Sequence, residues 1–184
     1  MKRTLYVLLS MILLLAFGLP LHMVNAYSEP ILNQPIKLTC HAYDNRVLNV
    51  YTSGDPELTN PVTLYSSSNG TSNHTQTWKF MTVPEYSSSA LYAYKLVLYY
   101  DQSLAAQYNH TTQKCTVYPW ASDPYSDYVV GKSSENSNNE FNIRLYFTGR
   151  ILGNSGNWNG AQCYWYSLGS TDTIPSSYYW AYAY

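Results

Sequence analysis

Charge is scarce in this sequence, and clustered positive charge is absent. Of 184 residues, 10 are Lys or Arg and 11 are Asp or Glu, which gives a net charge of −1 at pH 7. Binding to the phosphates of a nucleic acid requires clustered Lys and Arg side chains. Because no stretch is strongly basic, the composition argues against a nucleic acid as partner.

The chain also lacks the short motifs that accompany common catalytic sites. It has no His-Glu-x-x-His, no Gly-x-Ser-x-Gly and no Gly-rich phosphate loop. His41, His74 and His110 are scattered among polar residues, which favours exposed or capping roles over a metal site. The acidic residues are spread through loops and neither show nor exclude the paired carboxylates of a glycosidase. We therefore expect no catalytic residues, no metal and no cofactor.

Cysteine is rare as well, and its number is odd. Cys40, Cys115 and Cys163 are the only three in the sequence. At most one disulfide can form within the chain, and at least one thiol is left over. The sequence does not determine a pair, and a buried, apolar role for all three is the interpretation we favour slightly.

Long apolar runs are confined to the N-terminus. Lys2 and Arg3 precede the apolar stretch Leu5–Phe17, a glycine and a proline then interrupt it, and Val24-Asn25-Ala26 offers small or short residues at a cleavage point. This pattern predicts a secretory signal peptide over residues 1–26. The alternative is an uncleaved anchor, but the run falls short of the roughly 20 apolar residues that a membrane span needs.

Cleavage would leave 158 residues (184 minus 26), enough for one domain with a sizeable core. Without Lys2 and Arg3, eight basic residues stand against 11 acidic ones, a net charge of −3. We expect an extracellular protein with a single domain over residues 27–184.

What the chain has in abundance is tyrosine, with 21 copies. Tyrosine favours β-strands, and it offers a flat apolar face with a hydroxyl at its edge. We expect some of these rings to serve the core and the strand surface, and others to form binding platforms.

Three short strand patterns recur along the chain, namely VTLYS, CTVYP and CYWYS. They span Val62–Ser66, Cys115–Pro119 and Cys163–Ser167. In an alternating strand, the first and third residues face one side and the second and fourth face the other. The inward residues are predicted to be Val62, Cys115 and Cys163, followed by Leu64, Val117 and Trp165; the outward residues are Tyr65, Tyr118 and Tyr166.

The residues around these patterns place them in three units, about 36–80, 94–130 and 141–184. Leu48, Leu104 and Leu152 precede the three patterns by 14, 11 and 11 residues, and we take them as equivalent. Three extra residues in the loop GDPELTNP account for the longer spacing in the first unit. Each unit opens with an apolar alternating stretch: IKLTC from Ile36, YKLVLYY from Tyr94 and FNIRLYF from Phe141.

The closing segments of the units are less regular. Trp78 follows Tyr65 by 13 residues and Trp180 follows Tyr166 by 14, whereas the second unit has only DYVV (Asp127–Val130) near that distance. About four short strands per unit, repeated three times, predict an all-β β-trefoil, a closed six-stranded barrel capped by three hairpins.

The order of motifs resembles that of the ricin B-type (Gln-x-Trp) β-trefoil lectins. In the first unit VLNV (Val47–Val50), VTLY and TQTWKF (Thr75–Phe80) follow the family order, and in the third unit ILG, CYWY and SYYWAY do so. The resemblance covers nearly the whole mature chain, although each motif is short. It implies a shallow sugar pocket in each unit, with an aromatic ring on the apolar face of the sugar.

The resemblance also implies which residues would contact a sugar. The stacking aromatic falls on Tyr65, Tyr118 and Tyr166, and the polar group two residues earlier falls on Thr63, Thr116 and Tyr164. The sugar-binding carboxylate falls on Asn49, Ala105 and Gly153, so no unit keeps an Asp. The amide of the Gln-x-Trp motif falls on Gln76 alone, and its alternative role is to brace the backbone of its own unit.

Tryptophans add two candidates for ligand contact. Trp78 is not one of them, because it is expected to be core. Trp120 and Trp158 lie among turn-forming residues, so each is a candidate ligand contact outside the family's usual positions. The predicted carbohydrate-binding residues are Asn49, Thr63, Tyr65, Gln76, Tyr118, Tyr166 and Trp158.

The sequence therefore predicts a secreted, non-catalytic protein that binds glycans or glycoconjugates. A first alternative is a secreted trefoil that binds a protein, as an inhibitor or a toxin or adhesion subunit. A second is a trefoil whose sugar sites have decayed, which the missing carboxylates favour, and an enzyme ranks third.

Overall fold

The computed structural model describes residues 30–68, 73–83, 86, 93–120, 128–132, 139–169 and 172–183. The predicted signal peptide, residues 1–26, lies outside this part of the chain. No helix within the described residues has the length and apolar character needed to cross a membrane. The regular structure is almost entirely β-strand, as the alternating patterns predicted.

Each of the three units contributes four strands. The first unit holds β1 (Lys37–Cys40), β2 (Arg46–Val50), β3 (Val62–Ser66) and β4 (Trp78–Thr82). The second holds β5 (Tyr94–Leu98), β6 (Leu104–Tyr108), β7 (Cys115–Pro119) and β8 (Val129–Lys132). The third holds β9 (Ile143–Leu145), β10 (Ile151–Asn154), β11 (Ala161–Tyr166) and β12 (Trp180–Ala183), with the short 3-10 helix η3 (Ser176–Tyr178) before β12. Strands β3 and β7 have the bounds that the sequence predicted.

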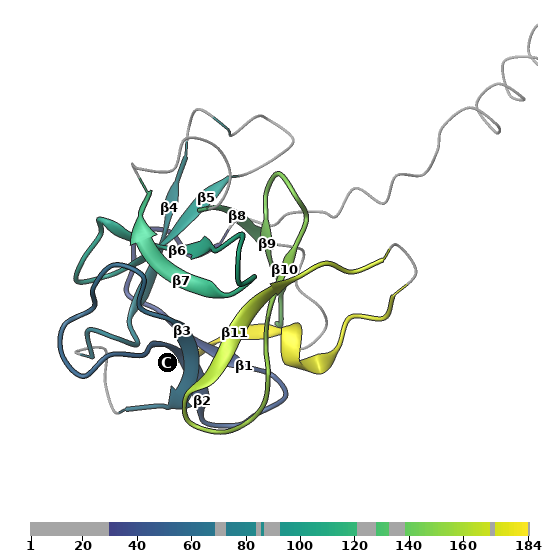
Figure 1. Ribbon diagram of the computed structural model, residues 1–184, viewed down its shortest axis with the longest axis horizontal. Helices are drawn as coiled ribbons and strands as arrows, with labels where there is room; N and C mark the ends of the chain where they lie inside the picture. The colour runs from purple at the N-terminus through teal and green to yellow at the C-terminus, as the bar shows by residue number, and fades with distance from the viewer. Residues whose placement is uncertain are drawn as a thin grey trace, which may run out of the picture.

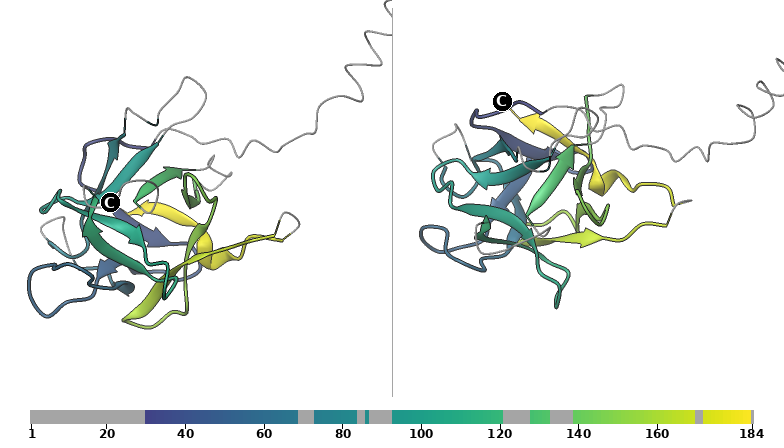
Figure 2. Two further views of the ribbon diagram at one scale, coloured as in Figure 1. Left: turned by 45° about the horizontal axis from the view of Figure 1, so that its top comes forward. Right: turned by 90° about the horizontal axis from the view of Figure 1, so that it is seen from above.

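The first and last strands of the units close into a six-stranded barrel (Figure 1). Ladders join β4 to β5, β5 to β8, β8 to β9 and β12 to β1. The two remaining seams are made by isolated bridges, Ile36–Trp78 and Leu32–Phe80 at β4 and Phe141–Trp180 at β12. Figure 2 shows β12 lying beside β1, so the end of the chain seals the barrel. Closure pairs strands that would otherwise be open edges, and open edges promote aggregation.

The middle strands form the three hairpins β2–β3, β6–β7 and β10–β11. The hairpins contact one another in a triangle. Strand β11 pairs with β3 through Ala161 and Leu64, and the bridges Pro61–Thr116 and Lys114–Tyr164 make the other two sides. A six-stranded barrel with three linked hairpins is a β-trefoil, the fold that the repeat predicted.

Tryptophans join the barrel to the hairpins in the first and third units. Trp78 and Trp180 are fully buried, and their indole Nε1 atoms donate to the backbone oxygens of Leu48 and Leu152, both at 3.0 Å. Each bond satisfies the polar atom of a large apolar side chain inside the core. The predicted core role of Trp78 is confirmed.

The second unit reaches the same packing with the residue sizes reversed. Val130 takes the place of the tryptophan and pairs with Tyr94, in the way that Trp78 bridges to Ile36. The large residue has thus moved from the closing strand to the opening strand, where the Tyr94 ring meets Phe80 edge to face at 6.1 Å. Strand β8 is present although the DYVV segment is irregular in sequence. The irregularity therefore reflects a change of packing partner and not the loss of a strand.

The side chain of Gln162 lies where the three hairpins meet. Its Nε2 atom is 2.8 Å from the backbone oxygen of Val62, 2.8 Å from that of Cys163 and 3.2 Å from that of Cys115. These three residues hold equivalent positions in the middle strands. The two N–H groups of this amide are thus shared among three backbone oxygens, one from each hairpin.

The predicted inward residues of β3, β7 and β11 are confirmed. All six, including Cys115 and Cys163, are completely buried. Cys40 is buried as well, and all three thiols are free, as the favoured interpretation held. Burial raises the pKa of each thiol; for Cys163 the neighbouring Cys115 and Cys40 add to the effect.

Candidate functional site

A cavity of about 760 Å³ opens at the hairpin of the first unit. Three segments form its walls: the end of β3, the loop of residues 51–60 that follows β2, and the segment 73–76 before β4. Its lining includes the predicted residues Asn49, Tyr65 and Gln76, and no Lys or Arg is among the described residues that line it. The cavity falls in the range of about 300–1,000 Å³ that is typical of small-molecule sites.

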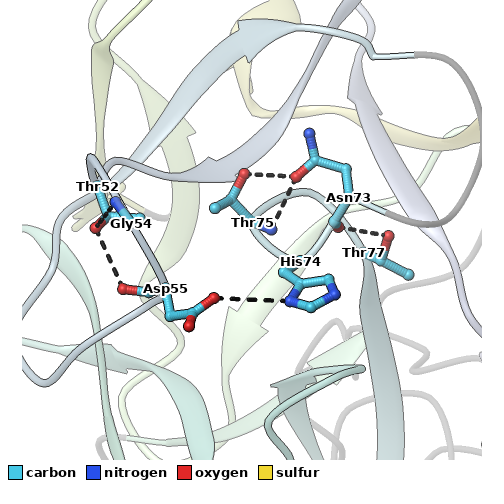
Figure 3. A network of polar contacts seen from close by, with 7 residues as sticks. All are labelled: Thr52, Gly54, Asp55, Asn73, His74, Thr75 and Thr77. Atoms are coloured by element: carbon cyan, nitrogen blue, oxygen red, sulfur yellow. Dashed lines mark hydrogen bonds and ion pairs between the residues drawn. The ribbon is translucent and has the colours of Figure 1, made fainter.

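Asn73, Thr75 and Asn49 form a chain of hydrogen bonds along one wall (Figure 3 shows Asn73 and Thr75). The Thr75 hydroxyl lies 2.7 Å from Asn73 Oδ1 and 2.9 Å from Asn49 Oδ1. A hydroxyl has one proton, so it donates to only one of these two oxygens at a time. Asn73 Oδ1 also accepts from the Thr75 backbone amide at 2.9 Å. When the hydroxyl donates to Asn73, Asn49 Oδ1 is therefore the oxygen left to accept from a ligand donor, such as a sugar hydroxyl.

Two of the predicted polar residues are instead committed to the protein itself. Gln76 is only 2% exposed; its Oε1 accepts from the Ser68 amide and hydroxyl, both at 3.0 Å, and its Nε2 donates to the Ser66 oxygen at 2.9 Å. The amide of Gln76 therefore braces the chain after β3, which is the alternative role that the sequence left open. Thr63 is buried beneath Asn49 and accepts a long bond of 3.4 Å from Asn49 Nδ2.

Two aromatic residues line the cavity, Tyr51, which is 56% exposed, and Tyr65, which is 39% exposed. The neighbouring Ser66 is held by the third unit, because its amide and hydroxyl donate to Asn159 Oδ1 at 2.8 and 3.0 Å. The Arg46 guanidinium also donates to Asn159 Oδ1, at 3.0 Å. A loop distant in sequence thus fixes the strand that presents Tyr65.

The loop after β2 brings the carboxylates of Asp55 and Glu57 to the rim of the cavity. Neither residue belongs to the motifs of the lectin family. Asp55 Oδ1 lies 3.8 Å from His74 Nδ1, across the gap between the loop and segment 73–77 (Figure 3). The Thr52 hydroxyl holds the turn of this loop through the Asp55 oxygen and the Gly54 amide. The sequence feature that could have indicated these two carboxylates is the loop GDPELTNP, which is three residues longer than its counterparts.

In the third unit the corresponding space is filled by protein. Tyr178 precedes Trp180 by two residues, as Gln76 precedes Trp78, and its ring stacks on Tyr166 with centroids 4.6 Å apart. A Cβ atom on Gly153 would meet the Tyr178 ring at 2.1 Å, so only glycine fits beneath it. Burial, followed by the neighbouring Tyr178 and Tyr164, raises the pKa of Tyr166 to about 12.

In the second unit the strand register corrects the motif comparison by two residues. Gln107 pairs with Thr116, as Asn49 pairs with Thr63, so Gln107 and not Ala105 takes the carboxylate position. Ala106 likewise replaces Leu104 as the equivalent of Leu48. The error arose because Cys115 pairs with Tyr108, seven residues earlier, whereas Cys163 pairs with Asn154, nine residues earlier. The tighter turn of the second unit is closed by a bond of 3.0 Å from the Asn109 amide to the Lys114 oxygen.

Tyr118 of this unit pairs with Ala105 and is half-buried. Tyr128, two residues before Val130, stands where the first unit has Gln76, and it is buried. Trp120 packs beside it, with the Lys95 ammonium 3.2 Å from the indole centroid. Trp120 is therefore part of a packed cluster, whereas Trp158 is 56% exposed, as its glycine-rich surroundings suggested.

His41, His74 and His110 are all exposed. Within the described residues, no group of three or more His, Cys, Asp or Glu side chains could hold a metal ion.

Comparison with known proteins supports the fold and leaves the family open. No protein-family model matches the chain. No curated protein matches it either. Among solved structures it is similar to a mosquitocidal holotoxin, with a TM-score of 0.65 and 17% identity over 83% of this chain. This match spans 17% of the toxin chain, so the protein is similar to one part of a much longer molecule.

Two smaller proteins match over most of both chains. A designed threefold symmetric protein, ThreeFoil, has a TM-score of 0.61 and 16% identity over 80% of this chain and 96% of its own. A Caenorhabditis elegans protein of unknown function has a TM-score of 0.55 and 14% identity over 83% of this chain and 94% of its own. These likenesses define the class as β-trefoil proteins with a threefold repeat.

Proposed function

We propose that this protein is a secreted, non-catalytic lectin of the ricin B type that binds carbohydrate in the pocket of its first unit. The proposal rests on the pairing of Tyr65 with the wall formed by Asn73, Thr75 and Asn49. A sugar presents an apolar face that suits an aromatic ring, and hydroxyls that need directed donors and acceptors. Both kinds of surface line the same cavity.

One chemical detail favours a ligand rich in hydroxyl groups. The Thr75 hydroxyl has one proton, so Asn49 Oδ1 is left as an acceptor for the ligand when that proton goes to Asn73. Asn49 supplies no formal charge, and the bond it offers is therefore weaker than one to a carboxylate. We expect modest affinity for a single sugar.

The proposal assigns one sugar site to the chain and not three. Tyr178 occupies the third site, and the buried Tyr128 stands in the second unit where Gln76 stands in the first. Avidity on a glycan-covered surface would then require several chains or a larger assembly.

Glycan-array binding of the mature chain tests the proposal, with Tyr65→Ala beside the wild type. We expect binding to a subset of glycans and its loss in Tyr65→Ala. Phe147→Ala is the matched control, because Phe147 is an exposed aromatic outside the cavity lining. An array on which no glycan binds would overturn the proposal.

The alternative is a trefoil that binds a protein, as a toxin or adhesion subunit. The observation in its favour is the similarity to one part of a mosquitocidal holotoxin chain. The same glycan array distinguishes the two proposals, since a protein-binding surface would bind no glycan on it. Sites that have decayed would also leave the array blank, and the third unit is the example of such a site.

A further inference from the structure

A second, smaller cavity of about 290 Å³ adjoins the pocket of the first unit. Asp55, Pro56, His74, Tyr100 and Asp101 line it. Asp55 lines both cavities, and the contact between Asp55 and His74 lies where they meet. His74 itself stands between Asn73 and Thr75, two residues that line the larger pocket.

The second cavity has the same two kinds of surface as the first. The His74 and Tyr100 rings stack with centroids 4.4 Å apart and planes 21° from parallel, and 46% of Tyr100 is exposed. Asp55 and Asp101 supply carboxylate acceptors beside the rings. Asp101 is held in place because its Oδ1 accepts from the Ser103 amide at 3.1 Å and from the Ser103 hydroxyl at 2.6 Å.

This arrangement depends on contacts between two units. Asp55 and Pro56 come from the lengthened loop of the first unit, whereas Tyr100 and Asp101 come from the turn after β5 in the second. The backbone amide of Tyr99 donates to the Thr77 oxygen at 2.9 Å, which fixes that turn against the segment carrying His74. The cavity is therefore built from two units together, and not from the equivalent residues of a single unit.

We propose that this second cavity is a subsite for the neighbouring residue of an oligosaccharide whose first residue lies against Tyr65. The inference rests on the proposed function. Among the described residues, the linings of the two cavities contain Asp55, Glu57 and Asp101 but no Lys or Arg. A neutral oligosaccharide therefore fits, while the carboxylate of a sialic or uronic acid would meet like charge.

Titration calorimetry with defined sugars tests the subsite. The probes are galactose, lactose, N-acetylglucosamine and the β1,4-linked dimer and trimer of N-acetylglucosamine. We expect at least one disaccharide to bind tighter than its monosaccharide. Tyr100→Ala should weaken the disaccharide about three- to tenfold, as the loss of ring stacking implies, and leave the monosaccharide unchanged. Tyr100→Phe should retain the disaccharide affinity.

The outcomes that contradict the subsite differ from those that contradict the lectin. Equal affinity for monosaccharide and disaccharide, or an equal effect of Tyr100→Ala on both, overturns the subsite while sugar binding at Tyr65 stands. Binding of none of the probes also overturns it, and the glycan array then decides the proposed function separately. Tighter binding of 3′-sialyllactose than of lactose would contradict the preference for neutral sugars. Thermal unfolding of each variant verifies that it is folded.

Discussion

The ring of Tyr178 lies flat on the ring of Tyr166, 4.6 Å away between centroids and 15° from parallel. This pair turns a potential ligand platform into a packed surface, since Tyr166 is the third-unit counterpart of Tyr65. The stack also explains the glycine at position 153, which leaves room for the Tyr178 ring.

Removal of this stack should affect stability and not sugar binding. Tyr178→Ala should lower the free energy of unfolding by about 1–3 kcal/mol, through lost burial and ring contact. It should leave the stoichiometry of sugar binding at one per chain. Urea unfolding and titration calorimetry measure the two quantities. A loss of binding equal to that of Tyr65→Ala would show that the third unit holds the sugar.

The side-chain amide of Gln162 should make a large contribution to the stability of the fold. Gln162→Leu leaves the backbone oxygens of Val62, Cys115 and Cys163 without their shared donor, and should cost about 1–3 kcal/mol. Gln102→Leu, at an exposed position, is the matched control and should change stability by less than about 0.5 kcal/mol. Equal stability of the two variants in urea would contradict a structural role for the Gln162 amide.

Two tryptophans should behave in opposite ways. Trp78→Ala removes a fully buried side chain and its bond to Leu48, and should destabilise the protein by about 3–5 kcal/mol. Trp158→Ala removes an exposed ring and should have an effect within about 0.5 kcal/mol. Thermal or urea unfolding measures the stability of both variants. A large loss of stability in Trp158→Ala would contradict the exposed position of its ring.

The buried thiols and Tyr166 predict a loss of stability at alkaline pH. Burial raises the pKa of Cys115 and Cys163 above the ordinary 9.0, and it raises the pKa of Tyr166 from 10.0 to about 12. The unfolded chain releases these protons first, so their contribution is complete below about pH 9 and is lost as the pH rises toward the folded pKa values.

Melting temperature measured from pH 7 to pH 11 tests this dependence. We expect the midpoint to fall above about pH 9, and the fall to become shallower in the double variant Cys115→Val, Cys163→Val. Valine suits both positions because Val62 occupies the equivalent place in the first unit. A midpoint that rises between pH 9 and pH 11 would contradict the assignment.

The sequence by itself determined the repeat and the direction in which its strands face. Alternation within VTLYS, CTVYP and CYWYS depends only on the two-residue period of a strand, so the inward residues and the core position of Trp78 followed from local pattern. Strand register did not follow, because it depends on turn length and pairing. Equal spacing along the chain therefore predicted Ala105 at the carboxylate position of the second unit, where the fold places Gln107.

The site was decided by tertiary structure. No pattern in the sequence reveals that the Gln76 amide is held by Ser66 and Ser68, or that Tyr178 covers Gly153. Nor does it place Asp55 beside His74, since a loop and a distant segment meet only when the barrel and its hairpins assemble. Local periodicity sets which way a side chain points, whereas long-range packing sets what it meets there.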